Sequence, residues 1–95
     1  MITVPPSVRT WIERELAAIP ADTGLHYERR LAKQHRAAII GGNAAYFFFL
    51  TMDGVLYQLD IDDVRQEMER ITNPDRIRDV LRACTEPVLR DLVVA

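Results

Sequence analysis

The chain begins with an apolar pattern of helical spacing. Hydrophobic residues recur at intervals of three and four and so share one face of a helix: Val8, Trp11, Ile12, Leu16 and Ile19. Pro5-Pro6-Ser7 precedes this pattern, and proline is tolerated in a first helical turn because that backbone N–H has no helical partner. Pro20 and the run Asp22-Thr23-Gly24 follow and favour a turn. The pattern predicts a helix that ends before Pro20.

Residues 25–40 carry two overlapping patterns. One set alternates as in a strand: Leu25, Tyr27, Arg29 and Leu31. Another set fits one face of a helix: Tyr27, Leu31, His35 and Ala38. The apolar run 37–40 then leads into Gly41-Gly42-Asn43, a strong turn signal. We expect strands over about 25–31 and 36–40, with a helix as the open alternative for this region.

The clearest local signal is a hairpin over residues 44–61. Residues 44–51 include Tyr46-Phe47-Phe48-Phe49-Leu50, so both faces of this strand are apolar and we expect a central strand covered on both sides. Asp53-Gly54 is typical of a two-residue hairpin turn, in which both central positions require positive φ. Residues 54–61 follow with one mostly apolar face, which predicts the second strand.

The last third of the chain has mostly helical spacing. Asp60 or Asp62 can cap a helix whose apolar face would hold Ile61, Val64, Met68 and Ile71. Asn73-Pro74 is typical of a cap and first helical residue, followed by an apolar face of Ile77, Val80, Leu81 and Cys84. Thr85 can cap a last short helix with Pro87 in its first turn.

Together these elements predict a single α+β domain over residues 1–95. Its small antiparallel sheet has the hairpin 44–51/54–61 at the centre, with an N-terminal helix and C-terminal helices packed on it. The chain is 48% hydrophobic and 27% charged, as in folded globular proteins rather than disordered ones. The longest apolar run, 44–50, is far shorter than the roughly 20 residues that cross a bilayer, so we expect no membrane partner.

The N-terminus and the cysteine content favour a cytoplasmic location. Residues 1–6 lack both the basic start and the long apolar stretch of a signal peptide. Cys84 is the only cysteine, so no internal disulfide can form and a reducing compartment suits the chain.

The densest acidic group consists of Asp60, Asp62, Asp63 and Glu67. Hard cations take carboxylate oxygens, so an alternative function is a small metal-dependent enzyme that uses this group. The EF-hand pattern is absent, however, and only Asp63 and Glu67 share a helical face by spacing. Acidic residues also stabilise a helix N-terminus through its dipole. We therefore expect a solvated helix start, with no metal or cofactor.

A basic patch lies earlier in the chain and includes Arg29, Arg30, Lys33 and Arg36. Phosphate binding requires such a patch, so a second alternative is a weak nucleic-acid binder. The formal net charge is −2, and Tyr27 is the only nearby aromatic residue for base stacking. We therefore expect a solvated face rather than a nucleic-acid site.

Sequence signatures of catalysis are missing. The chain contains no G-x-S-x-G, Walker loop or G-x-G-x-x-G. His26 and His35 have no paired ligand spacing. Cys84 falls at a predicted helix C-terminus, where the helix dipole disfavours a thiolate. We expect no catalytic residues and no enzymatic activity.

The charges divide between the two halves of the chain. Residues 1–50 carry six basic and four acidic side chains, and residues 51–95 carry six and ten, which gives +2 and −4. Such asymmetry suits binding of another protein, or head-to-tail self-association, more than catalysis. The candidate partner-binding residues are the two charged groups: Arg29, Arg30, Lys33, Arg36, Asp60, Asp62, Asp63 and Glu67.

The hairpin also resembles a known family. The stretch 42–60 is similar to the central hairpin of the SUKH superfamily. In it, the glycine turn at Gly42 leads to the aromatic strand Tyr46-Phe47-Phe48-Phe49, the turn Asp53-Gly54 and the strand Val55-Leu56-Tyr57-Gln58-Leu59-Asp60. The resemblance implies an α+β fold and a role as a bacterial immunity protein that binds and blocks a toxin. It implies no shared catalytic residues. SUKH domains are usually longer, and their leucine–proline segment after the first helix is represented here only by Ile19-Pro20.

Overall fold

The structure is a computed structural model that describes residues 2–22, 24 and 26–94. Thr23 of the predicted turn and Leu25 of the predicted strand lie outside the described residues. Four antiparallel strands form the main sheet in the order β2-β3-β4-β5: Ala37–Gly42, Tyr46–Thr51, Leu56–Asp60 and Glu69–Arg70. The helices are α1 (Pro6–Ala17), α2 (Tyr27–His35), α3 (Pro74–Ala83) and the short 3₁₀ helix η1 (Pro87–Asp91). This is the expected α+β fold.

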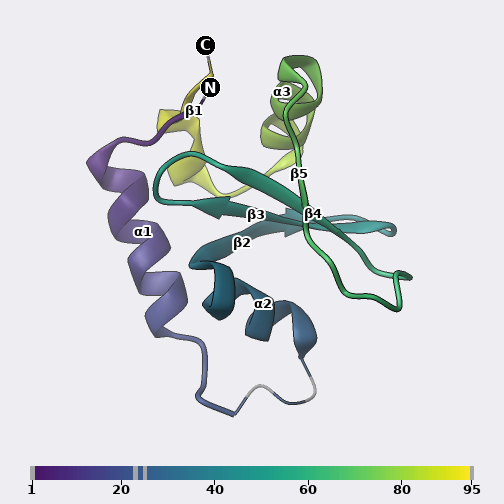
Figure 1. Ribbon diagram of the computed structural model, residues 1–95. Helices are drawn as coiled ribbons and strands as arrows, with labels where there is room; N and C mark the ends of the chain where they lie inside the picture. The colour runs from purple at the N-terminus through teal and green to yellow at the C-terminus, as the bar shows by residue number, and fades with distance from the viewer. Residues whose placement is uncertain (1, 23, 25, 95) are drawn as a thin grey trace.

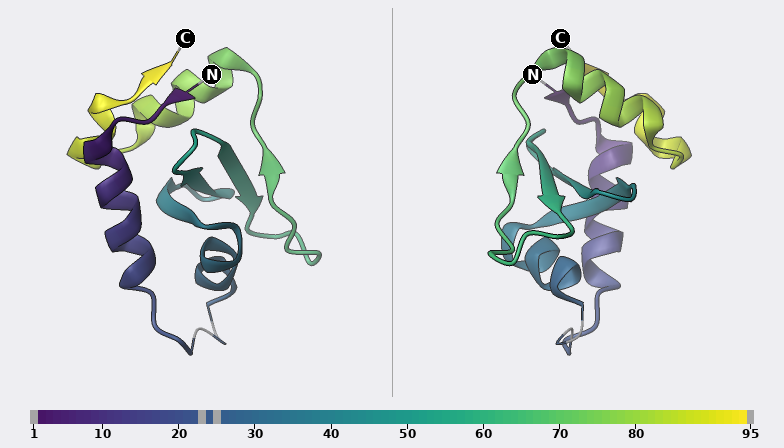
Figure 2. Two further views of the ribbon diagram at one scale, coloured as in Figure 1. Left: turned by 60° about the vertical axis from the view of Figure 1, so that its left-hand side comes forward. Right: turned by 90° about the vertical axis from the view of Figure 1, so that its right-hand side faces the viewer.

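Helices cover both faces of the main sheet. In Figure 1, α2 lies below the sheet and α3 and η1 lie above it, while α1 runs along one side. The side view in Figure 2 separates the same layers. Leu16 of α1 packs against the apolar residues of both faces, which places this helix beside the β2 edge. The predicted N-terminal helix and the predicted C-terminal helix from Pro74 are confirmed, and both pack on the sheet.

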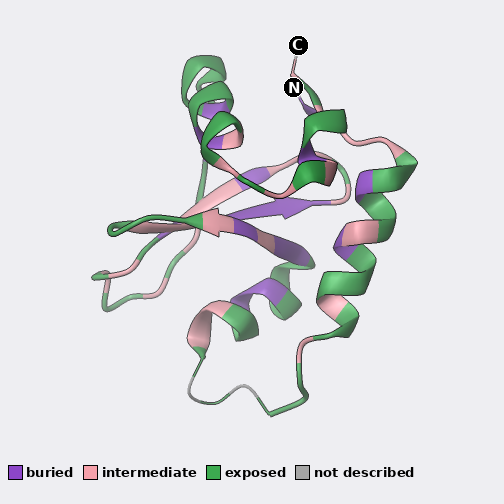
Figure 3. Ribbon diagram, turned by 180° about the vertical axis from the view of Figure 1, so that it is seen from behind, coloured by how far each residue is buried: buried purple, intermediate pink, exposed green. Residues whose placement is uncertain are grey.

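The central strand of the sheet is β3, as its sequence predicts. Phe48 and Leu50 point into the core formed with α1, α3 and η1, whereas Phe49 belongs to the core under α2. Successive strand residues face opposite sides, so an uninterrupted apolar run needs cover on both. Phe48 is 5% exposed and Phe49 is fully buried. Figure 3 shows the buried residues concentrated in β2, β3 and β4 and on the helix faces turned toward them.

The turn of the central hairpin differs from the prediction. Leu50 pairs with Leu56, and the N–H of Thr51 donates to the carbonyl of Val55 at 3.0 Å. The N–H of Gly54 donates back to the Thr51 carbonyl at 3.2 Å, and Gly54 has a φ of 87°. This is a three-residue loop with glycine in the left-handed position, not a two-residue turn. Asp53 does not take positive φ, so the loop needs only one left-handed residue.

The predicted strand over residues 25–31 is wrong, because residues 27–35 form α2. As a helix, this segment buries Leu31 and Ala32 and leaves Arg29 and Arg30 exposed. A strand would have placed Arg29 on the same face as Leu31. The helix ends at Arg36, which adopts the left-handed conformation with a φ of 52°. The second predicted strand, 36–40, appears as β2, but β2 continues through Gly41 and Gly42, which pair with Phe48 and Phe47, so the predicted turn at Gly41-Gly42-Asn43 begins later than expected.

The predicted helix from Asp60 or Asp62 to Ile71 is also wrong. Residues 61–68 form a loop, and Glu69–Arg70 form β5 at the sheet edge. Met68 packs into the core under α2, whereas Ile71 packs into the core on the opposite face. One face of a helix cannot pack against both faces of a sheet, but an extended edge segment can, because its successive side chains point to opposite faces. Neither Asp60 nor Asp62 caps a helix.

The C-terminal helix begins as its sequence predicts. The side chain of Asn73 accepts hydrogen bonds from the N–H groups of Asp75 at 2.9 Å and Arg76 at 3.2 Å, which caps α3. The predicted last short helix appears as the 3₁₀ helix η1, but its N-cap is Glu86 rather than the predicted Thr85, and no side chain caps it. The ends of the described chain then meet, since β1 (Ile2–Thr3) pairs antiparallel with β6 (Val93–Val94). Among the described residues, none of the helices combines the length and apolar character needed to cross a membrane.

Candidate functional site

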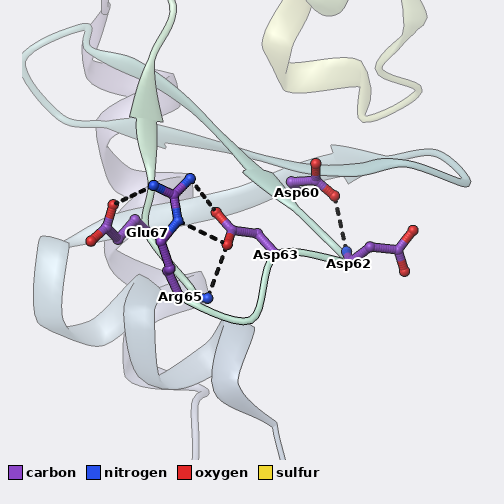
Figure 4. A network of polar contacts seen from close by, with 5 residues as sticks. All are labelled: Asp60, Asp62, Asp63, Arg65 and Glu67. Carbon is purple, nitrogen blue, oxygen red and sulfur yellow. Dashed lines mark hydrogen bonds and ion pairs between the residues drawn. The ribbon is translucent and has the colours of Figure 1, made fainter.

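The loop between β4 and β5, residues 61–68, is built by its own aspartates (Figure 4). Oδ1 of Asp60 accepts a hydrogen bond from the N–H of Asp62, and Oδ1 of Asp63 accepts one from the N–H of Arg65, each at 2.9 Å. Two backbone hydrogen bonds, from Asp63 to Asp60 and from Gln66 to Asp63, close successive turns. Aspartate favours such turns over helix because it offers nearby N–H groups a local acceptor.

Arg65 lies between two of the predicted acidic residues. Its Nε and Nη2 each donate to the Asp63 carboxylate at 3.2 Å, and its Nη1 is 3.9 Å from Oε2 of Glu67. The hydrogen bonds from Arg65 hold the pKa of Asp63 below its usual range, and the same pairing raises the pKa of Arg65. The guanidinium thus neutralises part of the acidic group from within the loop.

The four acidic residues do not converge on one point. The carboxylate of Asp62 points away from the Asp63–Arg65 pair, and that of Asp60 turns back toward the backbone of the loop (Figure 4). Within the described ranges, no group of three or more His, Cys, Asp or Glu side chains is placed to hold a metal ion.

The same loop holds a hydrophobic side chain in solvent. Val64 is 94% exposed, against 59% for Val93, the other exposed large hydrophobic residue of the described chain. Gln66, two residues later, has a φ of 54°, a conformation uncommon for residues other than glycine. An exposed apolar side chain and a left-handed residue thus occur together in a loop with fixed turns. Backbone outliers of this kind concentrate at functional sites.

The loop is attached to α2. The hydroxyl of Tyr27 donates to the carbonyl of Ile61 at 3.3 Å, and Nη2 of Arg30 donates to Oε1 of Gln66 at 3.1 Å. Met68 packs with the residues that α2 covers. Tertiary structure therefore brings one residue of the predicted basic group, Arg30, beside the loop that carries the predicted acidic group.

The predicted basic residues divide around α2. Arg30 faces the acidic loop. Arg29 instead lines a hollow of about 370 Å³ between α1, α2 and β2, and Lys33 and Arg36 line another of about 360 Å³ beside α1. Arg29, Lys33 and Arg36 thus share one side of α2 by their helical spacing, whereas Arg30 lies toward the acidic loop.

Cys84 sits at the C-terminal end of α3, as predicted. Its Sγ donates to the carbonyl of Val80 at 3.2 Å, and burial raises the pKa of the thiol. Because the thiolate is the reactive form, this environment disfavours covalent catalysis by Cys84.

Sequence reasoning missed three contributors to this surface. Val64 was expected on the buried face of a helix. The contacts that Tyr27 and Gln66 make between α2 and loop 61–68 were not expected. One signal was available: Asp60, Asp62 and Asp63 lie close together, and aspartate favours turns. The contacts of Tyr27 and Arg30 had no local signal, because they join residues more than 30 positions apart.

The surface has the parts of a binding site: turns fixed by hydrogen bonds, an exposed apolar side chain, and adjoining acidic and basic groups. Comparisons of the chain with protein-family models, with curated proteins and with solved structures found no match.

Proposed function

We propose that this chain is a non-catalytic protein-binding module whose partner contacts loop 61–68 and the adjoining part of α2. Val64 carries the proposal, because its side chain is 94% exposed on a loop whose turns are fixed by side-chain hydrogen bonds. A loop that is already ordered loses little conformational entropy when it binds. Val64 is therefore held ready to enter a pocket on a partner.

The charges around Val64 define the partner's surface. Asp62, Asp63 and Glu67 lie within three positions of Val64 in the loop, and Arg30 of α2 donates to Gln66 of the same loop. We expect a small apolar pocket rimmed mainly by basic groups, with an acidic group placed to meet α2. Such complementarity speeds association and selects the partner's orientation.

The resemblance of the hairpin to the SUKH superfamily supports one biological form of this binding. We propose that the partner is a bacterial toxin and that the module neutralises it by occupying its surface. That resemblance implies no shared catalytic residues, and inhibition by binding alone would require none.

Affinity capture from the source cell tests the proposal, with the wild-type chain and two variants as bait. Val64→Ser removes the proposed anchor, and Val93→Ser makes the same change at the other exposed valine. Both should keep the wild-type urea midpoint, because exposed substitutions usually change stability by less than about 0.5 kcal/mol. A specific partner should be captured by wild type and Val93→Ser and be depleted with Val64→Ser.

With the captured partner purified, Val64→Ser should raise Kd by about tenfold or more, the value of one buried valine side chain. Asp62→Lys should also raise Kd, by a larger factor at low salt than at high salt, because salt screens the charge. Co-expression of the wild-type chain should restore growth of cells that produce the partner, if that partner is a toxin. Equal capture by Val64→Ser and Val93→Ser would place the interface elsewhere and overturn the proposal.

A further inference from the structure

A second feature lies on the opposite side of the sheet from α2. The last turns of α3, the helix η1 and the strand β6 enclose an open hollow of about 470 Å³. Its apolar lining is aliphatic: Leu81, Leu89, Leu92 and Val94. Its remaining lining is charged or polar: Arg78, Arg82, Arg90, Glu86 and Cys84. The volume falls within the range of small-molecule sites.

The described residues give this hollow an excess of positive charge. Among them, three arginines line it against one glutamate. Arg78 has a partner, since its Nη1 is 3.4 Å from Oδ1 of Asp75. For Arg82 and Arg90, the described residues supply no carboxylate within 4.0 Å. Guanidinium groups remain charged at every physiological pH, so an anion in the hollow would offset their mutual repulsion.

The lining also selects the kind of anion. An inorganic anion would pair with the arginines but leave the aliphatic wall unused. The lining contains no aromatic side chain on which a nucleotide base would stack. A carboxylate on an unbranched aliphatic chain, or stem, matches both parts of this lining. Its two oxygens can accept hydrogen bonds from the arginine guanidinium groups, and its methylene groups can pack against the leucines.

We propose that this hollow binds an aliphatic carboxylate, with Arg82 and Arg90 as the carboxylate partners and Leu81, Leu89 and Leu92 around the stem. The carboxylate belongs either to a free fatty acid or to the C-terminus of a polypeptide that ends in aliphatic residues. This site is independent of the proposed partner surface at Val64, which lies across the sheet.

The alkylation rate of the Cys84 thiol would report whether a ligand occupies the hollow. Cys84 lines the hollow, it is half-buried, and its Sγ lies beside the sheet at Gly41, where an added Cβ would come within 3.3 Å. A stem that lies along the leucines would cover this thiol. Ligand binding should therefore slow alkylation of Cys84, whatever its effect on global stability.

The experiment measures the iodoacetamide alkylation rate of Cys84 and the Tm of the full chain in the presence of hexanoate, octanoate or decanoate. Octanol and octylamine at the same concentrations serve as controls for the stem without the negative charge. Alkylation should slow and Tm should rise with the carboxylates alone. Affinity should increase by about fourfold for each added methylene until the hollow is filled.

Two paired variants separate the site from general charge effects. Arg82→Gln/Arg90→Gln removes the proposed carboxylate partners and should weaken octanoate binding by about tenfold or more. Arg9→Gln/Arg14→Gln makes the same change in net charge on exposed positions of α1 and should bind like wild type. Both should keep the wild-type circular dichroism spectrum.

A peptide arm distinguishes the two sources of the carboxylate. Short peptides ending in Leu-Val are compared with a free and with an amidated C-terminus. Protection of Cys84 by the free-acid peptide, but not by fatty acids, would support the proposal and assign a polypeptide end; protection by fatty acids would assign a free ligand. Equal protection by octanol, or no loss in Arg82→Gln/Arg90→Gln, or no protection by any carboxylate, would overturn it.

Discussion

Gly54 packs directly against the backbone of Ile2. A Cβ atom placed on Gly54 would collide with the carbonyl oxygen of Ile2 and lie 3.2 Å from its carbonyl carbon. Gly54 also has a φ of 87°, which side chains other than hydrogen rarely allow. The residue thus serves two purposes, because it closes the central hairpin and lets β1 cross close to the turn. The aspartate–glycine signal in the sequence indicates only the first.

Gly54→Ala should destabilise the fold for both reasons. The left-handed conformation costs about 1–2 kcal/mol with a Cβ, and forcing atoms into the contact with Ile2 costs about 1–3 kcal/mol more. Urea unfolding measures the loss. Gly24→Ala is the control, since among the described residues its Cβ would meet only Oδ1 of Asp22 at 3.5 Å, and it should change stability by less than about 0.5 kcal/mol. Equal stability of the two variants would contradict the close approach of β1.

Phe48→Ala and Phe49→Ala should both be strongly destabilising. Phe48 is 5% exposed on one face of β3 and Phe49 is fully buried on the other, and truncation of a buried phenylalanine costs about 3–5 kcal/mol. That is most of the stability of a domain of this size. Soluble yield and circular dichroism should show both variants largely unfolded, while Val93→Ala, at an exposed position, stays folded. A silent substitution at either phenylalanine would mean that one face of the sheet is open.

Arg36→Gly should stabilise the protein. Arg36 ends α2 with a φ of 52°, where glycine avoids the steric penalty of a Cβ. Arg36→Ala removes the same charge but keeps the Cβ, so the difference between the two variants isolates the backbone effect. We expect Arg36→Gly to exceed Arg36→Ala by about 1 kcal/mol in free energy of unfolding. A glycine variant less stable than the alanine variant would exclude a left-handed helix end here.

The order of loop 61–68 should depend on pH through Asp63. Its pKa is lowered in the folded chain by Arg65, so the interaction is complete above the ordinary aspartate range of about 4 and is lost as pH falls through the lower folded value. The N–H of Arg65 donates to this carboxylate and should report the change in an NMR titration. Its midpoint should lie below the ordinary aspartate range, and Asp63→Asn should abolish the transition. A midpoint at or above that range would contradict the ion pair.

The sequence by itself determined the elements whose signals are local. Asn73-Pro74 supplies both a side-chain acceptor for two free N–H groups and a residue that needs no helical donor, so α3 begins where these residues stand. The uninterrupted apolar run in β3 requires cover on both faces, whichever elements provide it. The charged residues of the candidate site were likewise visible as two groups, because charge is a property of each residue.

Only the tertiary structure decided what residues 27–35 and 61–71 become. The first segment fits both a strand and a helical pattern and the second fits a helical pattern, but local propensity is too weak to decide the structure when packing favours another. Residues 27–35 are helical because the face of β3 that carries Phe49 needs an apolar cover, which Leu31 and Ala32 provide. Residues 61–71 form a loop and an edge strand rather than a helix because Met68 and Ile71 pack on opposite faces of the sheet, which no single helix face can reach. Val64 is consequently left in solvent, and the surface proposed to bind a partner exists because Tyr27 and Arg30 hold the loop from a distant part of the chain.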